Sequence, residues 1–160
     1  MSIRIKIING PNLNLLGVRE PHIYGSTSLE TVERNCRALA DTLGTAVEIV
    51  QSNSEGSMVE HIQAARDCAD AIVINPAAFS FRSVAIVDAI ASFEGPVIEL
   101  HVSNIHARDE MHRNSIISAA ATAVICGLGP WGYLAAMLAA AQLLDAVPDT
   151  FPEPLRAANR

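Results

Sequence analysis

The sequence contains few aromatic residues and one lysine, and each shortage narrows what the protein can be. Aromatic residues make up only 4% of the chain although half of it is apolar, so the core must be built from Ala, Ile, Leu and Val. That composition suits helices packed on a buried parallel sheet. The single lysine, Lys6, lies inside a predicted strand and argues against Schiff-base catalysis, which needs a lysine amine.

The charge, the apolar runs and the cysteines favour a reduced, cytoplasmic protein. The net charge is −6 and the basic residues are dispersed, which argues against nucleic acid or an anionic membrane surface as a partner. The Ala- and Leu-rich run at 131–144 is too short to span a membrane comfortably, and the N-terminus does not resemble a signal peptide. Cys36, Cys68 and Cys126 lack CxxC spacing, so we expect buried free thiols and no metal site.

Strand and helix patterns alternate along the chain and predict an α/β fold. The expected strands are 3–9, 46–51, 71–75, 96–101 and 122–126, and the expected helices are 28–43, 58–67, 83–92 and 131–145. This alternation predicts a flavodoxin-like, five-stranded parallel sheet in the order 2-1-3-4-5 with helices on both faces. We expect Thr27 and Ser57 to head capping boxes of the first two helices. Residues 1–146 should form one domain, and the Pro-rich tail 147–160 should be extended or flexible.

Polar residues end three of the predicted strands. Because ligands bind beyond the carboxyl ends of parallel strands, Asn9, Asn75 and His101 are expected to converge on one site. An imidazole in such a position suits general acid catalysis, whereas its structural alternative is a histidine that is merely hydrogen-bonded. His22, His61 and His106 are not paired at metal-ligand spacing and are interpreted as structural or surface residues.

A long polar loop, residues 10–25, follows the first strand, and loops of this length commonly act as lids or binding loops. Its Tyr24 becomes a useful base if a nearby guanidinium, such as that of Arg19, favours the phenolate. The alternative is that Tyr24 only packs the loop down. Prolines and leucines stand where a phosphate cradle needs small residues and free amides, which argues against a flavin.

Two stretches resemble a known family. Ile8 to Gly25 reads Ile-Asn-Gly-Pro-Asn-Leu-Asn-Leu-Leu-Gly-Val-Arg-Glu-Pro-His-Ile-Tyr-Gly and is similar to the signature loop of the type II 3-dehydroquinate dehydratases. Pro96 to Arg108 reads Pro-Val-Ile-Glu-Leu-His-Val-Ser-Asn-Ile-His-Ala-Arg and resembles the second signature of the same family. The resemblance covers residues 3–144 and implies an anti elimination of water from 3-dehydroquinate, giving 3-dehydroshikimate without a cofactor.

The resemblance also implies a set of roles. Tyr24 takes the proton next to the ketone, Asn12 holds the enolate oxygen through a water, and His101, supported by Glu99, protonates the departing hydroxyl. Arg19 and Arg108 keep Tyr24 ionised. The substrate contacts fall on Asn75, Val102, Ser103 and His112, and on Asp88 of an adjacent subunit. Family members assemble as trimers gathered into a dodecamer, in biosynthetic or catabolic pathways.

Two pocket positions depart from the family pattern. Phe81 stands where the family carries a substrate-binding histidine, and His112 stands where it carries an arginine that reaches substrate hydroxyls. Arg113 comes one residue late, a shift of roughly 100° on a helical turn. These departures leave open a non-catalytic binding or assembly protein, and a lyase for a related cyclic hydroxy acid.

Overall fold

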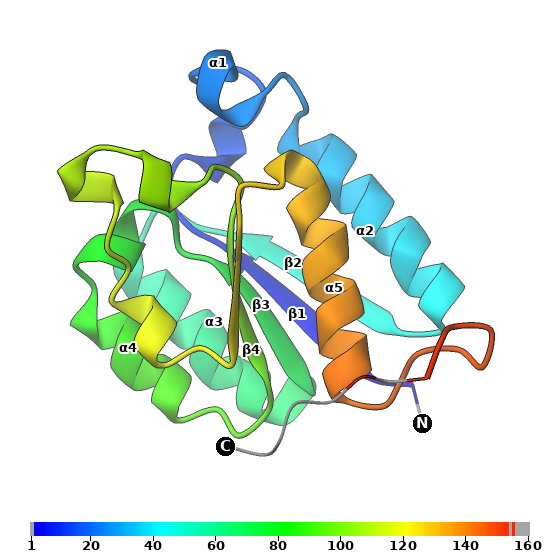
Figure 1. Cartoon of the computed structure of the whole chain (residues 1–160). Coiled ribbons are helices and arrows are strands. Elements are labelled where there is room, and N and C mark those ends of the chain that lie inside the picture. Colours follow the sequence, from blue (N-terminus) through cyan, green and yellow to red (C-terminus); the bar gives the residue numbers. More distant parts are fainter. Residues whose placement is uncertain (1, 154, 156–160) are drawn as a thin grey trace.

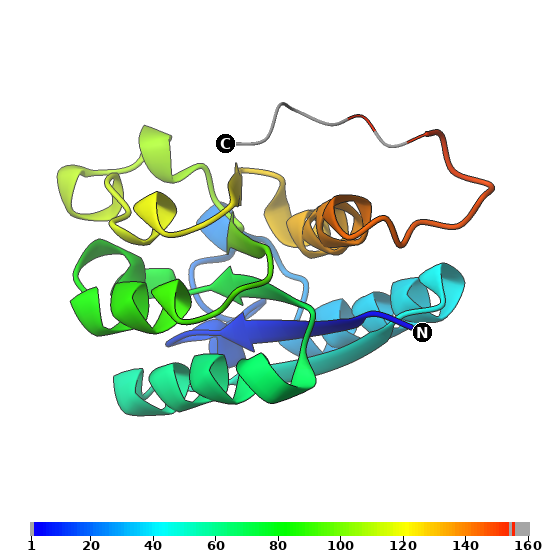
Figure 2. The ribbon, with the colours of Figure 1, turned by 90° about the horizontal axis from the view of Figure 1, so that it is seen from below.

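A parallel sheet at the centre of the computed structural model carries helices on both faces (Figures 1 and 2). The structure describes residues 2–153 and 155. The strands are β1 (Arg4–Asn9), β2 (Ala46–Gln51), β3 (Ala71–Asn75), β4 (Val97–His101) and β5 (Ala123–Cys126). Their order is β2-β1-β3-β4-β5 and each neighbouring pair is parallel, so the predicted fold and sheet order are confirmed.

Helices cover both faces of the sheet (Figure 1). Helices α2 (Leu29–Leu43) and α5 (Gly132–Leu143) pack on one face, and α3 (Glu55–Cys68) and α4 (Val84–Ala91) pack on the other. Successive strand residues point to opposite faces, so in β1 Ile7 joins the core under α5 whereas Ile8 joins the core under α3. Burial on both faces explains why the central strands read as nearly unbroken apolar runs.

Both predicted helix caps differ from the caps in the structure. The first lies one residue too early in the sequence, and the second lies three residues too late. Helix α2 is capped by Ser28, whose side chain accepts a hydrogen bond from the Thr31 amide, and not by Thr27. Helix α3 is capped by Ser54, which accepts from the Ser57 amide, so the helix begins at Glu55 instead of residue 58. A serine that precedes another serine by three residues offers two candidate caps, and only the first of them has an extended backbone.

The cysteines are free, as predicted, but they are not all buried. Cys36 is buried under the sheet, and burial raises the pKa of its thiol to about 12. Cys68 is exposed, which corrects the prediction, and Cys126 is only half-buried. The buried positions of α3 are Met58, Ile62 and Ala65, and the next position in that helical spacing is residue 69, so Cys68 falls just outside the buried stripe.

Little regular structure follows α5. In the described part of the chain no helix or strand comes after Leu143, and the Phe151 amide closes a turn on the Pro148 carbonyl at 2.8 Å. The predicted flexible tail extends to residues 154 and 156–160, which lie outside the described residues. Among the helices described, none has the length and apolar character needed to cross a bilayer.

Candidate active site

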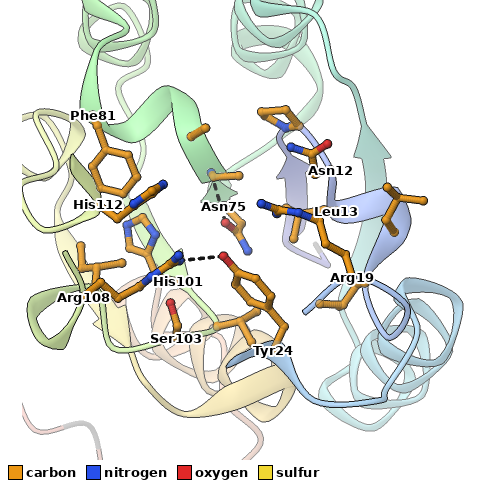
Figure 3. A pocket seen from close by; sticks show the side chains of 17 residues that line it. Asn12, Leu13, Arg19, Tyr24, Asn75, Phe81, His101, Ser103, Arg108 and His112 are labelled. Atoms are coloured by element: carbon orange, nitrogen blue, oxygen red, sulfur yellow. Dashed lines mark hydrogen bonds between the residues drawn. The ribbon is translucent and has the colours of Figure 1, made fainter. Parts of the chain in front are cut away.

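The loops that leave β1, β3 and β4 meet at the carboxyl edge of the sheet and enclose a pocket (Figure 3). The loop after β1 contains the short helices η1 (Leu13–Leu15) and α1 (Pro21–Tyr24). The segments after β3 and β4 supply η2 (Ala77–Phe81), η3 (Ile105–Ala107) and η4 (Glu110–His112). The polar and charged residues that line the pocket are Asn12, Arg19, Tyr24, Asn75, His101, Ser103, Arg108 and His112. Most of the predicted site residues are therefore brought together.

The first and third strands hold their loops in close contact. The Gly10 amide donates to the Asn75 carbonyl at 2.8 Å, and a Cβ atom at Gly10 would lie 2.5 Å from the Pro76 carbonyl oxygen. Only glycine fits this approach, because the obstacle is backbone and not a flexible side chain. This contact places the loop that carries Tyr24 against the loop that carries Phe81.

Tyr24 contacts Arg108 directly. Arg108 Nη1 donates a hydrogen bond to the Tyr24 hydroxyl oxygen at 2.7 Å (Figure 3). A hydrogen bond from a permanent cation becomes stronger when the accepting oxygen carries negative charge. The guanidinium of Arg19 lies 5.8 Å from the Tyr24 ring centroid and pairs with Glu20 at 3.0 Å. Arg108 therefore makes the hydrogen bond to Tyr24, whereas Arg19, the partner favoured by the spacing in the sequence, lies near the ring.

His101 is held from behind by a buried carboxylate. Its Nε2 lies 2.6 Å from Oε1 of Glu99, a side chain that is fully buried on the same face of β4. Ser115 and Ser118 donate their hydroxyl hydrogens to the two oxygens of Glu99. Burial by itself would raise the pKa of Glu99, but the hydrogen bonds from His101, Ser115 and Ser118 together hold it below its usual value.

This arrangement fixes the imidazole of His101. An ionised carboxylate only accepts, so Nε2 carries a hydrogen toward Glu99 and Nδ1 is the nitrogen left for the pocket. The sequence argument anticipated the support from Glu99, but it missed the two serines.

Asn9 does not reach the pocket, contrary to the sequence prediction. It is fully buried, and its Oδ1 accepts a hydrogen bond from the Tyr133 hydroxyl at 2.7 Å. Asn9 and Asn75 are neighbours in the parallel register of β1 and β3 and face the α5 layer together. Asn75 does line the pocket, and its Nδ2 donates to the same hydroxyl at 3.0 Å. Both residues end a strand, but only Asn75 lies beside the open part of the site.

Tyr133 was missed by the sequence argument. It lies in an Ala- and Leu-rich helix and shows no motif of its own. Its hydroxyl could have indicated a role, because a buried tyrosine in an apolar helix needs a hydrogen-bond partner from another element. The partners, Asn9 and Asn75, are strand-terminal residues that the sequence analysis had singled out.

The two residues that depart from the family pattern lie side by side (Figure 3). The Phe81 ring is stacked on His101 at 6.5 Å between centroids and meets the edge of His112 at 5.5 Å. His112 Nδ1 lies 2.8 Å from the Asp109 carboxylate, and this hydrogen bond lowers the pKa of Asp109. Arg113 donates to the Arg108 carbonyl and is not among the pocket residues, so it does not take the place of His112.

Four further predicted residues divide between the pocket and the surface. Val102 and Ser103 line the pocket directly after His101, as expected. Asn12 lies across the pocket from Ser103 (Figure 3) with a left-handed backbone (φ 66°), and its amide donates to the Asn53 side chain at 2.9 Å. Asp88 is exposed on α4 and is not among the pocket residues of its own chain. In the described part of the chain, no group of three or more metal-ligating side chains is assembled.

Comparison with known proteins gives one consistent family. The family model described as dehydroquinase class II matches residues 3–141. A protein of Verticillium alfalfae named catabolic 3-dehydroquinase is 52% identical over 142 residues, which are 89% of this chain and 95% of that protein. A protein of Aspergillus terreus named catabolic 3-dehydroquinase 1 is 55% identical over 133 residues, which are 83% of this chain and 88% of that protein.

Solved structures agree with the sequence relatives. The type II dehydroquinase from Butyrivibrio crossotus has a TM-score of 0.85 and 38% identity over 86% of this chain and 97% of that one. The type II dehydroquinase from Propionibacterium acnes has a TM-score of 0.82 and 44% identity over 88% of this chain and 97% of that one.

Proposed function

Because the chain belongs to the class II dehydroquinase family, we propose that it removes water from 3-dehydroquinate to give 3-dehydroshikimate. The observation that carries this proposal is the pocket itself, which presents a phenol bound to a guanidinium beside an imidazole bound to a buried carboxylate. The two pairs supply a base and an acid, as an elimination of water requires. The relatives' names favour an enzyme over a non-catalytic binding protein, and a catabolic over a biosynthetic role.

The proposed reaction begins at Tyr24. Its phenolate, stabilised by Arg108 and assisted by Arg19, removes a proton from the carbon next to the substrate ketone. The electrons move into the carbonyl and form an enolate, whose oxygen is held through a water by Asn12. Preorganised donors of this kind stabilise charge that develops in the transition state.

The second half of the reaction is assigned to His101. As the enolate electrons return, the C–O bond breaks, and His101 Nδ1 gives its proton to the departing hydroxyl to form water. Glu99 stabilises the imidazolium before transfer and keeps the ring in place afterwards. Val102 and Ser103 are proposed to bind the substrate carboxylate, and Asn75 and His112 are proposed to bind its hydroxyls. The loop from Leu16 to Gly25, which contains α1, is proposed to close over the site.

The test is the appearance of the conjugated enone by ultraviolet absorbance when the purified protein meets 3-dehydroquinate. A Tyr24→Phe variant is the matched control, because it keeps the ring and removes the proposed base. Turnover should fall at least about 100-fold in the variant, the lower range for general acid–base catalysis. A folded wild-type protein without turnover would contradict the proposal. The same assay with a panel of related cyclic hydroxy acids tests the alternative substrate class. If another acid is turned over faster than 3-dehydroquinate, the protein is a lyase for that acid.

We also propose that the chain assembles as trimers gathered into a homododecamer in the cytoplasm. Asp88 is exposed on α4 outside its own pocket, so it can contribute to a site only in another copy of the chain. The exposed side chain of Val84, on the same helix, is suited to burial in such a contact. The free cysteines support a reducing compartment. Sedimentation of the purified protein measures the mass of the assembly.

A further inference from the structure

Tyr133 joins helix α5 to the carboxyl ends of β1 and β3. The whole residue is buried, and its hydroxyl lies between the side chains of Asn9 and Asn75, at 2.7 Å from Asn9 Oδ1 and 3.0 Å from Asn75 Nδ2. Burial raises the pKa of Tyr133, so the group stays a neutral phenol. It therefore has one hydrogen to give and lone pairs with which to accept.

The direction of each hydrogen bond follows from the neighbouring backbone. The Ala77 amide points at the Asn75 side chain at 3.3 Å, and an amide N–H only donates, so the atom facing it is Oδ1. Nδ2 of Asn75 then faces Tyr133 and donates to its oxygen. The hydroxyl hydrogen of Tyr133 is left for Asn9 Oδ1. The Ala77 amide thus sets the orientation of the Asn75 amide, and the Tyr133 hydroxyl accepts from the Nδ2 that this orientation presents.

We propose that Tyr133 is a positioning residue, which fixes the Asn75 amide so that its second N–H is available to a ligand in the pocket. Asn75 borders the pocket whereas Tyr133 does not, and Asn75 is the pocket residue to which the Tyr133 hydroxyl is hydrogen-bonded. Without the phenolic oxygen, one of the two contacts that hold the amide is lost. The amide is then held only by the Ala77 amide at 3.3 Å, and the direction of its second N–H is less strictly fixed.

The kinetic test rests on the proposed dehydration of 3-dehydroquinate and uses a double-mutant cycle. Tyr133→Phe in the wild-type background should lower kcat/KM about tenfold, which corresponds to one hydrogen bond of roughly 1.4 kcal/mol. In an Asn75→Ala background the same change should alter kcat/KM by less than about twofold, since no amide remains to be positioned. Equal losses in the two backgrounds would show a general structural role and overturn the inference, as would no loss in the wild type.

Thr122→Val is the matched stability control. It removes the hydrogen bond from the Val97 amide to the Thr122 hydroxyl, which lies at the far end of β4 from the pocket. Its kcat/KM should equal that of the wild type. A comparable loss in this variant would attribute the Tyr133→Phe effect to stability and not to the position of Asn75.

A second readout needs no turnover and no Asn75 variant. The assigned side-chain amide resonances of Asn75 in a deuterated, ¹⁵N-labelled protein report the hydrogen bond directly. In Tyr133→Phe they should shift, and their hydrogens should exchange with solvent at least about tenfold faster than in the wild type. If the Asn75 resonances and their exchange rates are the same in Tyr133→Phe as in the wild type, the inference is overturned, whether or not the wild type turns over 3-dehydroquinate. Failure of the wild type to turn over 3-dehydroquinate would contradict only the proposed function.

Discussion

Phe81 gives the pocket an apolar wall beside the imidazole that is proposed to act as the acid. Its ring covers His101 and meets the edge of His112, whose Nδ1 is occupied by Asp109. Apart from Nδ1 of His101, which is assigned to the acid step, a hydroxylated substrate finds one imidazole nitrogen on this side, Nε2 of His112. A substrate hydroxyl that is buried there without a partner costs about 1 to 3 kcal/mol.

Replacing Phe81 should therefore improve the binding of 3-dehydroquinate. Phe81→His supplies a ring nitrogen at the same place, and we expect KM to fall about tenfold, the effect of one hydrogen bond of roughly 1.4 kcal/mol. Phe81→Leu is the control, since it opens similar space without a polar atom and should leave KM unchanged or higher. Steady-state kinetics of the three proteins measure the effect. A KM that does not fall in a folded Phe81→His protein would mean that this wall is not where the substrate hydroxyls lie.

The carboxylate of Glu99 should make the stability of the protein depend on pH. Its pKa is lowered in the native state, so its ionised form stabilises the fold above pH 4.5, the ordinary value, and this contribution is lost as the pH falls through the native pKa. Glu99→Gln should thus lower the free energy of unfolding by about 1 to 3 kcal/mol at pH 7, and by progressively less as the pH falls below 4.5. Urea unfolding at pH 7 and at a series of lower pH values measures the difference. Glu60→Gln, at an exposed position of α3, should show no such dependence.

At the level of the elements, hydrophobic pattern and topology were enough to predict the sheet. Strands β2 and β3 have the predicted bounds, because strand and turn residues alternate sharply there. The start of α3 was wrong because Ser54 and Ser57 are both good caps, and side-chain chemistry alone does not tell which backbone is extended.

Truncation of the two serines should distinguish these caps. Ser54→Ala should lower the free energy of unfolding by about 1 kcal/mol, since the Ser57 amide loses its acceptor. Ser57→Ala should change it by less than about 0.5 kcal/mol, because Ser57 contributes its backbone amide and not its hydroxyl. Denaturant unfolding measures both values. A larger loss in Ser57→Ala than in Ser54→Ala would place the start of the helix at the later serine.

Residues of the site could be predicted where they end a strand or lie in a sequence motif. Contacts between side chains of different elements could not be predicted in this way. His101, Asn75 and Tyr24 were found in the pocket because they follow strands or lie in the long loop. The contacts from Arg108 to Tyr24 and from Tyr133 to Asn75 join residues 84 and 58 positions apart. No local spacing encodes such pairs, since they depend on how the loops and α5 pack.

At the level of the whole molecule, an assembly in which Asp88 enters a neighbour's pocket allows complementation between inactive subunits. Tyr24→Phe and Asp88→Ala should each lower turnover as pure assemblies. Co-expression of the two should restore part of it, because some sites then combine an intact Tyr24 from one chain with an intact Asp88 from another. The rate per site of separately purified and co-expressed assemblies measures the recovery. If the mixture is only as active as the average of its parents, Asp88 does not act across subunits.

The buried lysine of β1 has a practical consequence for the study of that assembly. Lys6 is the chain's only lysine, it is 3% exposed, and its ammonium is paired with Glu48 at 3.2 Å. The usual bifunctional crosslinkers react with lysine amines on protein surfaces, and this side chain is shielded from them. Crosslinking with such reagents should therefore join few of the subunits of the proposed assembly. Reagents that link carboxyl groups suit this measurement better, since acidic side chains are plentiful on the surface.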